Sequence, residues 1–294
     1  MQHGGIPAGT SLGREHADVP KDVVSFHDHS RRTARRPDSA GDGSVAVSFA
    51  SRGALLEDLE HRLASRAGFA VATLNLDHVV KLRRVERFRA AYARHSHVVA
   101  DGNPIVWLHR LAGRPVSLVP GSELVQPLAA LAARLKVPVA LLGGTPETLE
   151  RAAARLTAAH PGLRIAARVA PPFGLDPEGP EAEACLAEVG ASGARLCLVA
   201  LGAPKQEILS VRGMDMLPHC GFVSVGAGLD FIAGHQVRAP AWVQKMAMEW
   251  AWRMATDPRR LARRYLDCAL ILPGLGLAAM RARRNGQQPG RRAA

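Results

Sequence analysis

The sequence lacks the short motifs that mark several common enzyme classes. It has no Gly-x-x-x-x-Gly-Lys-Ser/Thr phosphate loop and no Gly-x-Ser-x-Gly nucleophile elbow. No Gly-x-Gly-x-x-Gly segment opens the first expected strand–helix unit, which weakens a dinucleotide-binding interpretation. Aromatic residues make up only 4% of the 294 residues, whereas 47% are hydrophobic. This composition suits an α/β protein better than an all-β one.

Motifs for metal binding and redox chemistry are absent as well. The four cysteines have no C-x-x-C spacing, and Cys197 lies within an apolar strand pattern, so we expect reduced thiols in the cytoplasm. No Asp-x-Asp pair follows an expected strand. A site that handles a diphosphate would therefore depend on arginines and helix N-termini, and we expect no metal and no cofactor.

Long apolar segments are also missing, but positive charge is abundant. The N-terminus has no apolar h-region and no run of about 20 apolar residues occurs, so neither a signal peptide nor a membrane-spanning helix is expected. The formal net charge is +12, and basic residues concentrate in the first forty positions and after Arg253. This distribution indicates an anionic partner, which would be a nucleic acid, a membrane surface or a phosphorylated substrate.

The stretch 195–207 defines the expected fold. Residues 196–201 form an apolar run short enough for a strand buried on both faces, Gly202 ends it, and Pro204 stands where a helix would begin. Similar strand–glycine–helix units recur along the chain, and Asp77 is expected to cap one of their helices. The pattern predicts a doubly wound, mostly parallel, Rossmann-like α/β sheet with a C-terminal helical appendage.

Composition divides the chain into four segments. We expect a disordered basic N-terminal arm over residues 1–43 and an α/β core over 44–236. A helical, membrane-associating appendage is expected over 237–284, and a disordered basic tail over 285–294.

Polar residues stand where the expected strands end. Asp101 directly follows the apolar residues 98–100, so we expect partial desolvation, which improves a carboxylate as a general base. A turn-capping role for this Asp-Gly pair is the competing interpretation. Because the carboxyl ends of parallel strands share one edge, other strand-end residues are expected to meet Asp101 in one crevice. These are Thr73, Asn75, Thr145, Gln206 and Asp230, each of which taken alone also suits a turn or strand role.

Nine segments of the chain, in order and spacing, match the motifs of one family. They are residues 73–75, 100–106, 120–122, 142–144, 201–207, 225–231, 238–242, 249–253 and 258–265. With these segments the chain resembles the WecG/TagA/CpsF family of bacterial glycosyltransferases (glycosyltransferase family 26) over about residues 45–270. Any one segment alone is a weak signal, but nine in register are strong.

The resemblance implies an inverting, metal-independent glycosyltransferase of cell-surface polysaccharide biosynthesis. It would move a sugar from a UDP-sugar, of the N-acetylmannosamine type or a related hexose, to a polyprenyl-diphosphate-linked sugar. The family's proposed base corresponds to Asp101, and its diphosphate-binding arginines correspond to Arg253, Arg260 and Arg263. The substrate-binding residues expected from the motifs and the strand ends are Thr73, Asn75, Gly143, Gly144, Gly202, Gln206, Glu207 and Asp230.

The polyprenyl chain of such an acceptor stays in the bilayer, so the enzyme would have to come to the membrane. Residues 266–280 form an apolar run flanked by arginines, which is too short to span a bilayer but suits docking on anionic lipid. We therefore expect a cytoplasmic protein that is peripheral on the inner face of the cell membrane. A core helix with a solvated tail is the competing interpretation.

Two departures from the family pattern leave the donor and the acceptor open. Glu123 stands where relatives usually carry Asp, and Ile208-Leu209 replaces a common aromatic residue. Two other functions remain as alternatives: a sugar-nucleotide-modifying enzyme such as an epimerase, and a basic nucleic-acid-binding protein. The latter has no zinc, helix-turn-helix or aromatic-plus-basic sheet signature in its favour, so we expect no nucleic acid partner. The sequence leaves the oligomeric state open, a homo-oligomer included.

Overall fold

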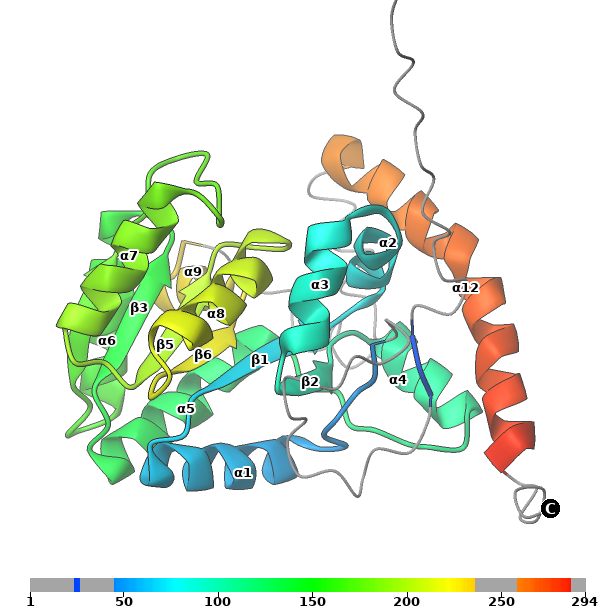
Figure 1. The fold of residues 1–294 in the computed structure, drawn as a ribbon, viewed down its shortest axis with the longest axis horizontal. Coiled ribbons are helices and arrows are strands. Elements are labelled where there is room, and N and C mark those ends of the chain that lie inside the picture. The colour runs from blue at the N-terminus through cyan, green and yellow to red at the C-terminus, as the bar shows by residue number, and fades with distance from the viewer. Residues whose placement is uncertain (1–23, 27–44, 236–257, 287–294) are drawn as a thin grey trace, which may run out of the picture.

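The computed structural model describes residues 24–26, 45–235 and 258–286 (Figure 1). Six parallel strands form one sheet in the order β2-β1-β6-β5-β3-β4. This arrangement confirms the expected doubly wound α/β fold. The strands are β1 (Phe69–Leu74), β2 (His97–Ala100), β3 (Val139–Gly143), β4 (Ile165–Val169), β5 (Leu196–Ala200) and β6 (Gly221–Ser224).

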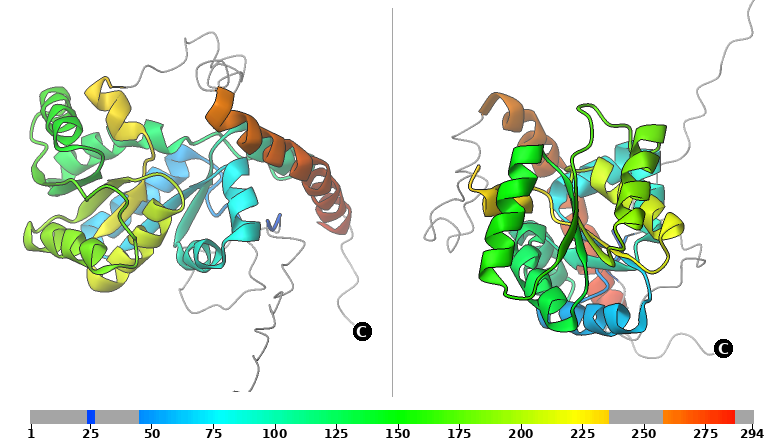
Figure 2. Two further views of the ribbon diagram at one scale, coloured as in Figure 1. Left: turned by 90° about the horizontal axis from the view of Figure 1, so that it is seen from above. Right: turned by 90° about the vertical axis from the view of Figure 1, so that its left-hand side faces the viewer.

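Helices cover both faces of the sheet, as Figure 2 shows. One face is covered by α1 (Arg52–Ser65), α5 (Gly121–Leu135), α6 (Pro146–Ala159) and α9 (Gly228–Ala233). The other face is covered by α3 (Glu86–Arg94), α7 (Pro180–Ala191) and α8 (Lys205–Met216). Beside β1 and β2 lie α2 (Leu76–Arg84), α4 (Asn103–Leu111) and α12 (Pro258–Gly286).

The apolar run of β5 is continuous because its side chains pack alternately into the hydrophobic cores on the two faces of the sheet. Leu196 and Leu198 pack in the core under α1, α5 and α6, whereas Cys197 and Val199 pack in the core under α7 and α8. Successive side chains of a strand point to opposite faces, and a central parallel strand has both faces covered. This burial on both faces is the arrangement that the sequence predicts for 196–201.

Helix starts follow the expected chemistry with one correction. Thr145 caps α6, accepting a hydrogen bond from the backbone N–H of Thr148. Asp77, expected as the cap of α2, lies inside its first turn, and Asn75 is the cap, with Oδ1 accepting from the His78 N–H at 3.0 Å. Both residue types cap helices well, and the cap falls on the one that directly follows the last residue of β1.

Three residues of the expected N-terminal arm are part of the folded core. Val24 forms a parallel bridge with Val45, and Val24 and Phe26 are 4% exposed. They pack in the core that also contains β1, β2 and α4. At these positions the structure differs from the expected disorder, because apolar side chains bury area here. The other residues of the arm lie outside the described residues.

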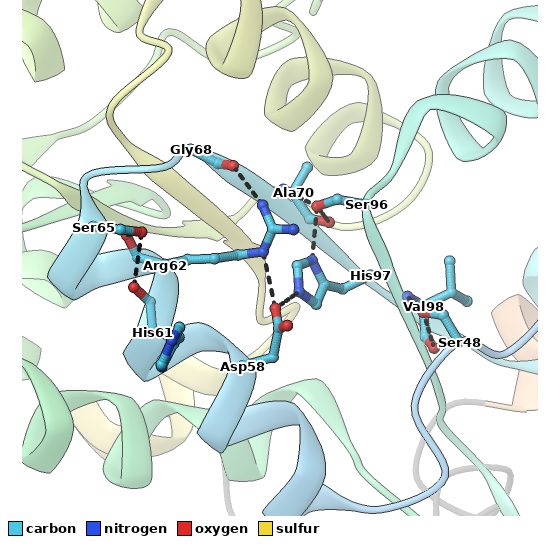
Figure 3. A network of polar contacts seen from close by, with 10 residues as sticks. All are labelled: Ser48, Asp58, His61, Arg62, Ser65, Gly68, Ala70, Ser96, His97 and Val98. Atoms are coloured by element: carbon cyan, nitrogen blue, oxygen red, sulfur yellow. Dashed lines mark hydrogen bonds and ion pairs between the residues drawn. The ribbon is translucent and has the colours of Figure 1, made fainter. Parts of the chain in front are cut away.

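A buried polar network lies at the amino end of β2 (Figure 3). The His97 ring, on β2, joins Asp58 of α1 through Nε2 (2.7 Å) and Ser96 Oγ through Nδ1 (2.7 Å). Asp58 also accepts from Arg62 at 2.9 Å. Ser96 Oγ in turn accepts from the backbone N–H of Ala70 on β1 at 2.9 Å. The network ties α1, β1 and β2 together, and its His97 is fully buried.

Helix α12 is longer than the apolar run that predicted it. It continues through Pro273 and spans 29 residues. Within the described part of the chain, the 25 residues Leu261–Asn285 form the one helical stretch long and apolar enough to cross a membrane, by length and composition alone. The expectation that this segment is too short to span was therefore wrong about its length. One side of α12 packs against the body of the protein, where Leu275 and Ala279 are buried.

Candidate functional site at the carboxyl edge of the sheet

Asp101 and Asn75 lie side by side where β1 and β2 end. The two strands pair up to Leu74 and Ala100, and the Asp101 N–H then donates to the Leu74 carbonyl at 2.7 Å. Gly102, at a φ of +94°, turns the chain so closely past Asn75 that a Cβ atom there would lie 3.8 Å from the Asn75 Cβ. Asp101 is half-buried. The strand pairing thus brings two expected site residues together at one edge.

Thr73 lies beneath the start of α5. Its side chain is 4% exposed. A Cβ atom on Gly121, the first residue of α5, would lie 3.2 Å from Thr73 Oγ1 and 2.8 Å from the Ser224 carbonyl oxygen. Only a glycine fits so close to two strand ends. The N-terminus of α5 therefore packs onto the ends of β1 and β6, next to Asp101 and Asn75.

Glycines form the turns after β3 and β5. Gly143, Gly144 and Gly202 all have positive φ values, of +119°, +71° and +69°. At Gly143 a Cβ atom would lie 2.3 Å from the Ala200 carbonyl oxygen, so the ends of β3 and β5 approach too closely for any side chain. Gly144 and Gly202 are exposed. The turns leave open backbone at the edge of the sheet.

Gln206 and Glu207 lie in the first turn of α8, and both are buried. Gln206 Oε1 accepts from the Gly226 N–H at 3.1 Å, and Gln206 Nε2 donates to Glu207 Oε1 at 2.8 Å. Glu207 is fully buried, and burial raises the pKa of its carboxyl to about 7. The buried Tyr92 has a raised pKa, first through burial and then through the charges of Glu207 and Asp101. Tyr92 therefore lies close enough to both carboxyl groups to interact with them electrostatically.

Asp230 is at the far side of this edge, on α9 after β6. Partial burial raises the pKa of its carboxyl, and the nearby His235 lowers it. The Asp230 carbonyl accepts from the His235 N–H at 3.0 Å, and the His235 ring bonds to Thr148 Oγ1 at 2.8 Å. These contacts connect α9 to the start of α6. Asp230 thus belongs to the β3–β6 half of the edge, while Asp101 and Asn75 belong to the β1–β2 half.

Helix α12 reaches the β1–β2 half through charged side chains on α2. Arg264 forms an ion pair with Asp77 Oδ1 at 3.1 Å, and Asp77 Oδ2 accepts from Lys81 Nζ at 2.7 Å. A second pair joins Arg84 to Asp267 at 2.7 Å. Arg263 is exposed on α12. Arg260 belongs to the helix, but its side chain is not among those described, and Arg253 lies outside the described residues.

The sequence did not predict Lys81, Asp77 or Arg264 as residues of the site. Lys81 Nζ also donates to the Ala203 carbonyl at 3.3 Å, in the turn between β5 and α8. The spacing of four residues between Asp77 and Lys81 could have indicated their pairing on one helix face. Nothing in the sequence indicates that Lys81 contacts Ala203 or that Asp77 contacts Arg264. Both contacts depend on how the helices and strands are arranged in three dimensions.

The fold and its polar edge together define a class of protein. A doubly wound parallel sheet with glycine turns and convergent polar side chains beyond its carboxyl ends is a Rossmann-like α/β protein with a ligand site at that edge. A family model for the WecG/TagA/CpsF family of glycosyl transferases matches residues 44–288, and the chain belongs to that family. The protein is therefore a glycosyltransferase of cell-surface polysaccharide biosynthesis.

Proposed function

We propose that the protein is an inverting, metal-independent hexosyltransferase. It moves a sugar from a UDP-sugar, of the N-acetylmannosamine type or a related hexose, to a sugar linked to polyprenyl diphosphate. The observation that carries this proposal is the position of Asp101. Its N–H is bonded to the last carbonyl of β1, which holds it beside Asn75 at the edge where parallel sheets bind ligands.

In this mechanism Asp101 is the general base. Its carboxylate takes the proton from an acceptor hydroxyl as that oxygen attacks the anomeric carbon, on the face opposite the departing UDP. Thr73, Asn75 and Gln206 contribute to the substrate site in this proposal, and the exposed backbone at Gly144 and Gly202 lets a substrate approach closely. Inversion follows because attack and departure occur on opposite faces of the sugar.

The leaving diphosphate gains negative charge in the transition state. Arg253, Arg260 and Arg263 supply the positive charge that stabilises it, in place of a divalent cation. Support for a role of this region comes from α12, since Arg264, a neighbour of Arg263, pairs with Asp77 two residues beyond Asn75. The charged side of α12 therefore starts beside the β1–β2 half of the edge.

The outer side of α12 carries the membrane contact in this proposal. Leu266, Leu270, Leu277 and Met280 are exposed, and they repeat every three, four or seven residues, which places them on one side of the helix. Basic residues follow them near the end of α12. An apolar stripe with adjacent positive charge binds an anionic bilayer surface. The protein would then act on the inner face of the cell membrane.

A donor screen with a short-chain lipid-diphosphate sugar as acceptor tests the activity. We expect one UDP-sugar to give a glycosylated lipid with inverted anomeric configuration. Asp101→Asn should keep the fold and the donor affinity but lower turnover roughly 10²–10⁴-fold, as expected for the loss of a general base. Asp215→Asn, which makes the same change at an exposed surface carboxylate, should leave turnover unchanged.

Product analysis separates the alternatives. A modified nucleotide sugar formed without acceptor would indicate an epimerase and would contradict the transfer reaction. If Asp101→Asn turns over within a few-fold of wild type at saturating substrates, Asp101 is not the base.

A further inference from the structure

Lys81 connects three segments that are far apart in the sequence. Its Nζ donates to Asp77 Oδ2 at 2.7 Å and to the Ala203 carbonyl at 3.3 Å. Asp77 Oδ1 faces Arg264 of α12 at 3.1 Å. A chain of charged contacts therefore runs from α12 through α2 to the turn between β5 and α8.

The Ala203 turn carries residues of the proposed substrate site. Gly202 precedes it, and Gln206 lies one helical turn beyond, with the Gln206 N–H bonded to the Gly202 carbonyl at 3.1 Å. The turn is half-exposed, and no strand ladder holds it, because β5 ends at Ala200. The hydrogen bond from Lys81 thus holds the Ala203 carbonyl from α2, a helix that is separate from the strand and the helix that the turn connects.

The contacts are sheltered enough to constrain the turn. The Asp77 side chain is 11% exposed, and those of Lys81 and Arg264 are 30% and 40% exposed. Hydrogen bonds in which one partner is charged are stronger than neutral ones, and partial burial reduces their screening by solvent. Lys81 also contributes a positive field at the buried Glu207 carboxyl. Both effects stabilise one position of the turn relative to α2.

We propose that Lys81 is a positioning residue for the turn between β5 and α8, and that Asp77 makes its position depend on α12. The docking of α12 against α2 holds Asp77 through Arg264, Asp77 orients the Lys81 ammonium, and the ammonium holds the Ala203 carbonyl. This inference rests on the proposed function only for its effect on activity, because the order of the turn can be measured without any substrate.

The second ion pair between α2 and α12 supplies a matched control. Arg84 and Asp267 join the same two helices at 2.7 Å, and within the described part of the chain neither forms a hydrogen bond or ion pair with the turn. Loss of that pair leaves the Arg264–Asp77 ion pair and the bond from Lys81 to Ala203 in place. A comparison of Lys81→Met with Arg84→Met on the full-length protein therefore separates positioning of the turn from anchoring of the helix.

Hydrogen exchange of the backbone amides at 205–208 is the first measurement. Lys81→Met should raise exchange in this segment, where the Gln206 and Ile208 N–H groups bond to Gly202 and Pro204 carbonyls, and Arg84→Met should not. Asp77→Asn should raise it as well, because the ammonium loses its orienting carboxylate. Unchanged exchange in Lys81→Met, or an equal rise in Arg84→Met, overturns the positioning role. Unchanged exchange in Asp77→Asn overturns the link to α12.

Kinetics with the soluble short-chain acceptor is the second measurement. Lys81→Met should lower kcat/KM roughly tenfold, as expected for the loss of one charge-assisted hydrogen bond, mainly through a higher KM for one substrate. Arg84→Met should stay within about twofold of wild type. If wild type transfers sugar and Lys81→Met does so equally well, the inference fails while the proposed function stands. If wild type transfers no sugar from any donor, the proposed function fails and the exchange data alone decide the inference.

Discussion

Several histidines of the core are held neutral by burial. The pKa of His78 is lowered to about 3, and those of His95 and His109 to about 4, because burial penalises the charged imidazolium. His95 Nδ1 donates to the Ala91 carbonyl at 2.9 Å, which leaves the proton off Nε2. His95 Nε2 is buried with no hydrogen-bond partner among the described residues. A proton added there would find nothing to bond to.

This burial predicts a loss of stability in mild acid. Below pH 6.5 unfolded His95 takes up a proton that the folded form refuses until about pH 4, so the free energy of unfolding falls as the pH is lowered through this range. His95→Leu should reduce the slope of the free energy of unfolding against pH by up to about 1.4 kcal/mol per pH unit, the value for the uptake of one proton. Urea unfolding at pH 4.5 to 7.5 measures it.

The exposed His61 offers the control for this prediction. His61 lies on the surface of α1, and His61→Leu should leave the pH dependence of the free energy of unfolding as in wild type. An unchanged slope in His95→Leu would show that other groups carry the acid sensitivity. The buried His78 and His109 would be among these groups, because their pKa values are lowered in the same way. Glu207 acts in the opposite direction: its raised pKa makes it stabilise the fold less as the pH rises from about 4.5 to 7.

At the scale of single elements, α12 has two different sides. Leu261, Cys268, Leu275 and Ala279 are buried, whereas Leu266, Leu270, Leu277 and Met280 are exposed. Single exposed leucines are ordinary on a protein surface, but several on one side of one helix are not. The burial of the first group against α2 and α4 fixes which side of the helix the second group presents.

Replacement of the exposed leucines should separate membrane binding from folding. The triple change Leu266→Ser, Leu270→Ser and Leu277→Ser should lower retention on anionic vesicles at least tenfold and shift the Tm little, because these side chains are 52–70% exposed already. Sedimentation with vesicles measures retention. Retention should also fall as the salt concentration rises.

Phe173 is the control for the loss of exposed apolar area. It is fully exposed in the loop after β4, far along the sheet from α12, and Phe173→Ser should leave retention unchanged. If the triple variant binds vesicles as wild type does, the stripe has another role.

Element by element, the sequence predicted β5 and the start of α8 to within one residue of their observed bounds, since an apolar run, a glycine and a proline mark those ends. It predicted the strand ends that carry Thr73, Asn75 and Asp101, because parallel strands share one carboxyl edge. It did not predict that Val85 divides α2 from α3, or that α12 runs on through Pro273. It also missed the contacts of Lys81 with Ala203, which depend on how α2 sits on the sheet.

At the scale of the whole molecule, positive charge replaces a metal clamp in the proposed reaction. The net charge is +12, and the proposed diphosphate contacts are arginines of the C-terminal region. We therefore expect EDTA to leave the turnover within about twofold of that without chelator, because a guanidinium stabilises the developing diphosphate charge without a cation. Activity lost with EDTA and restored by Mg²⁺ or Mn²⁺ would contradict metal independence.

The network of Asp58, Ser96 and His97 occupies the end of β2 opposite Asp101. Asp101 follows His97 by four positions, about 13 Å at the usual rise of a strand. Because the network lies at the amino end of β2, substitutions there change how firmly α1 holds the sheet and leave the polar edge in place. The protein can thus be made more or less heat-resistant at one end of a strand while the other end keeps its reactivity. Stability and reactivity can therefore be changed separately, by substitutions at the amino end of β2 and at its carboxyl end.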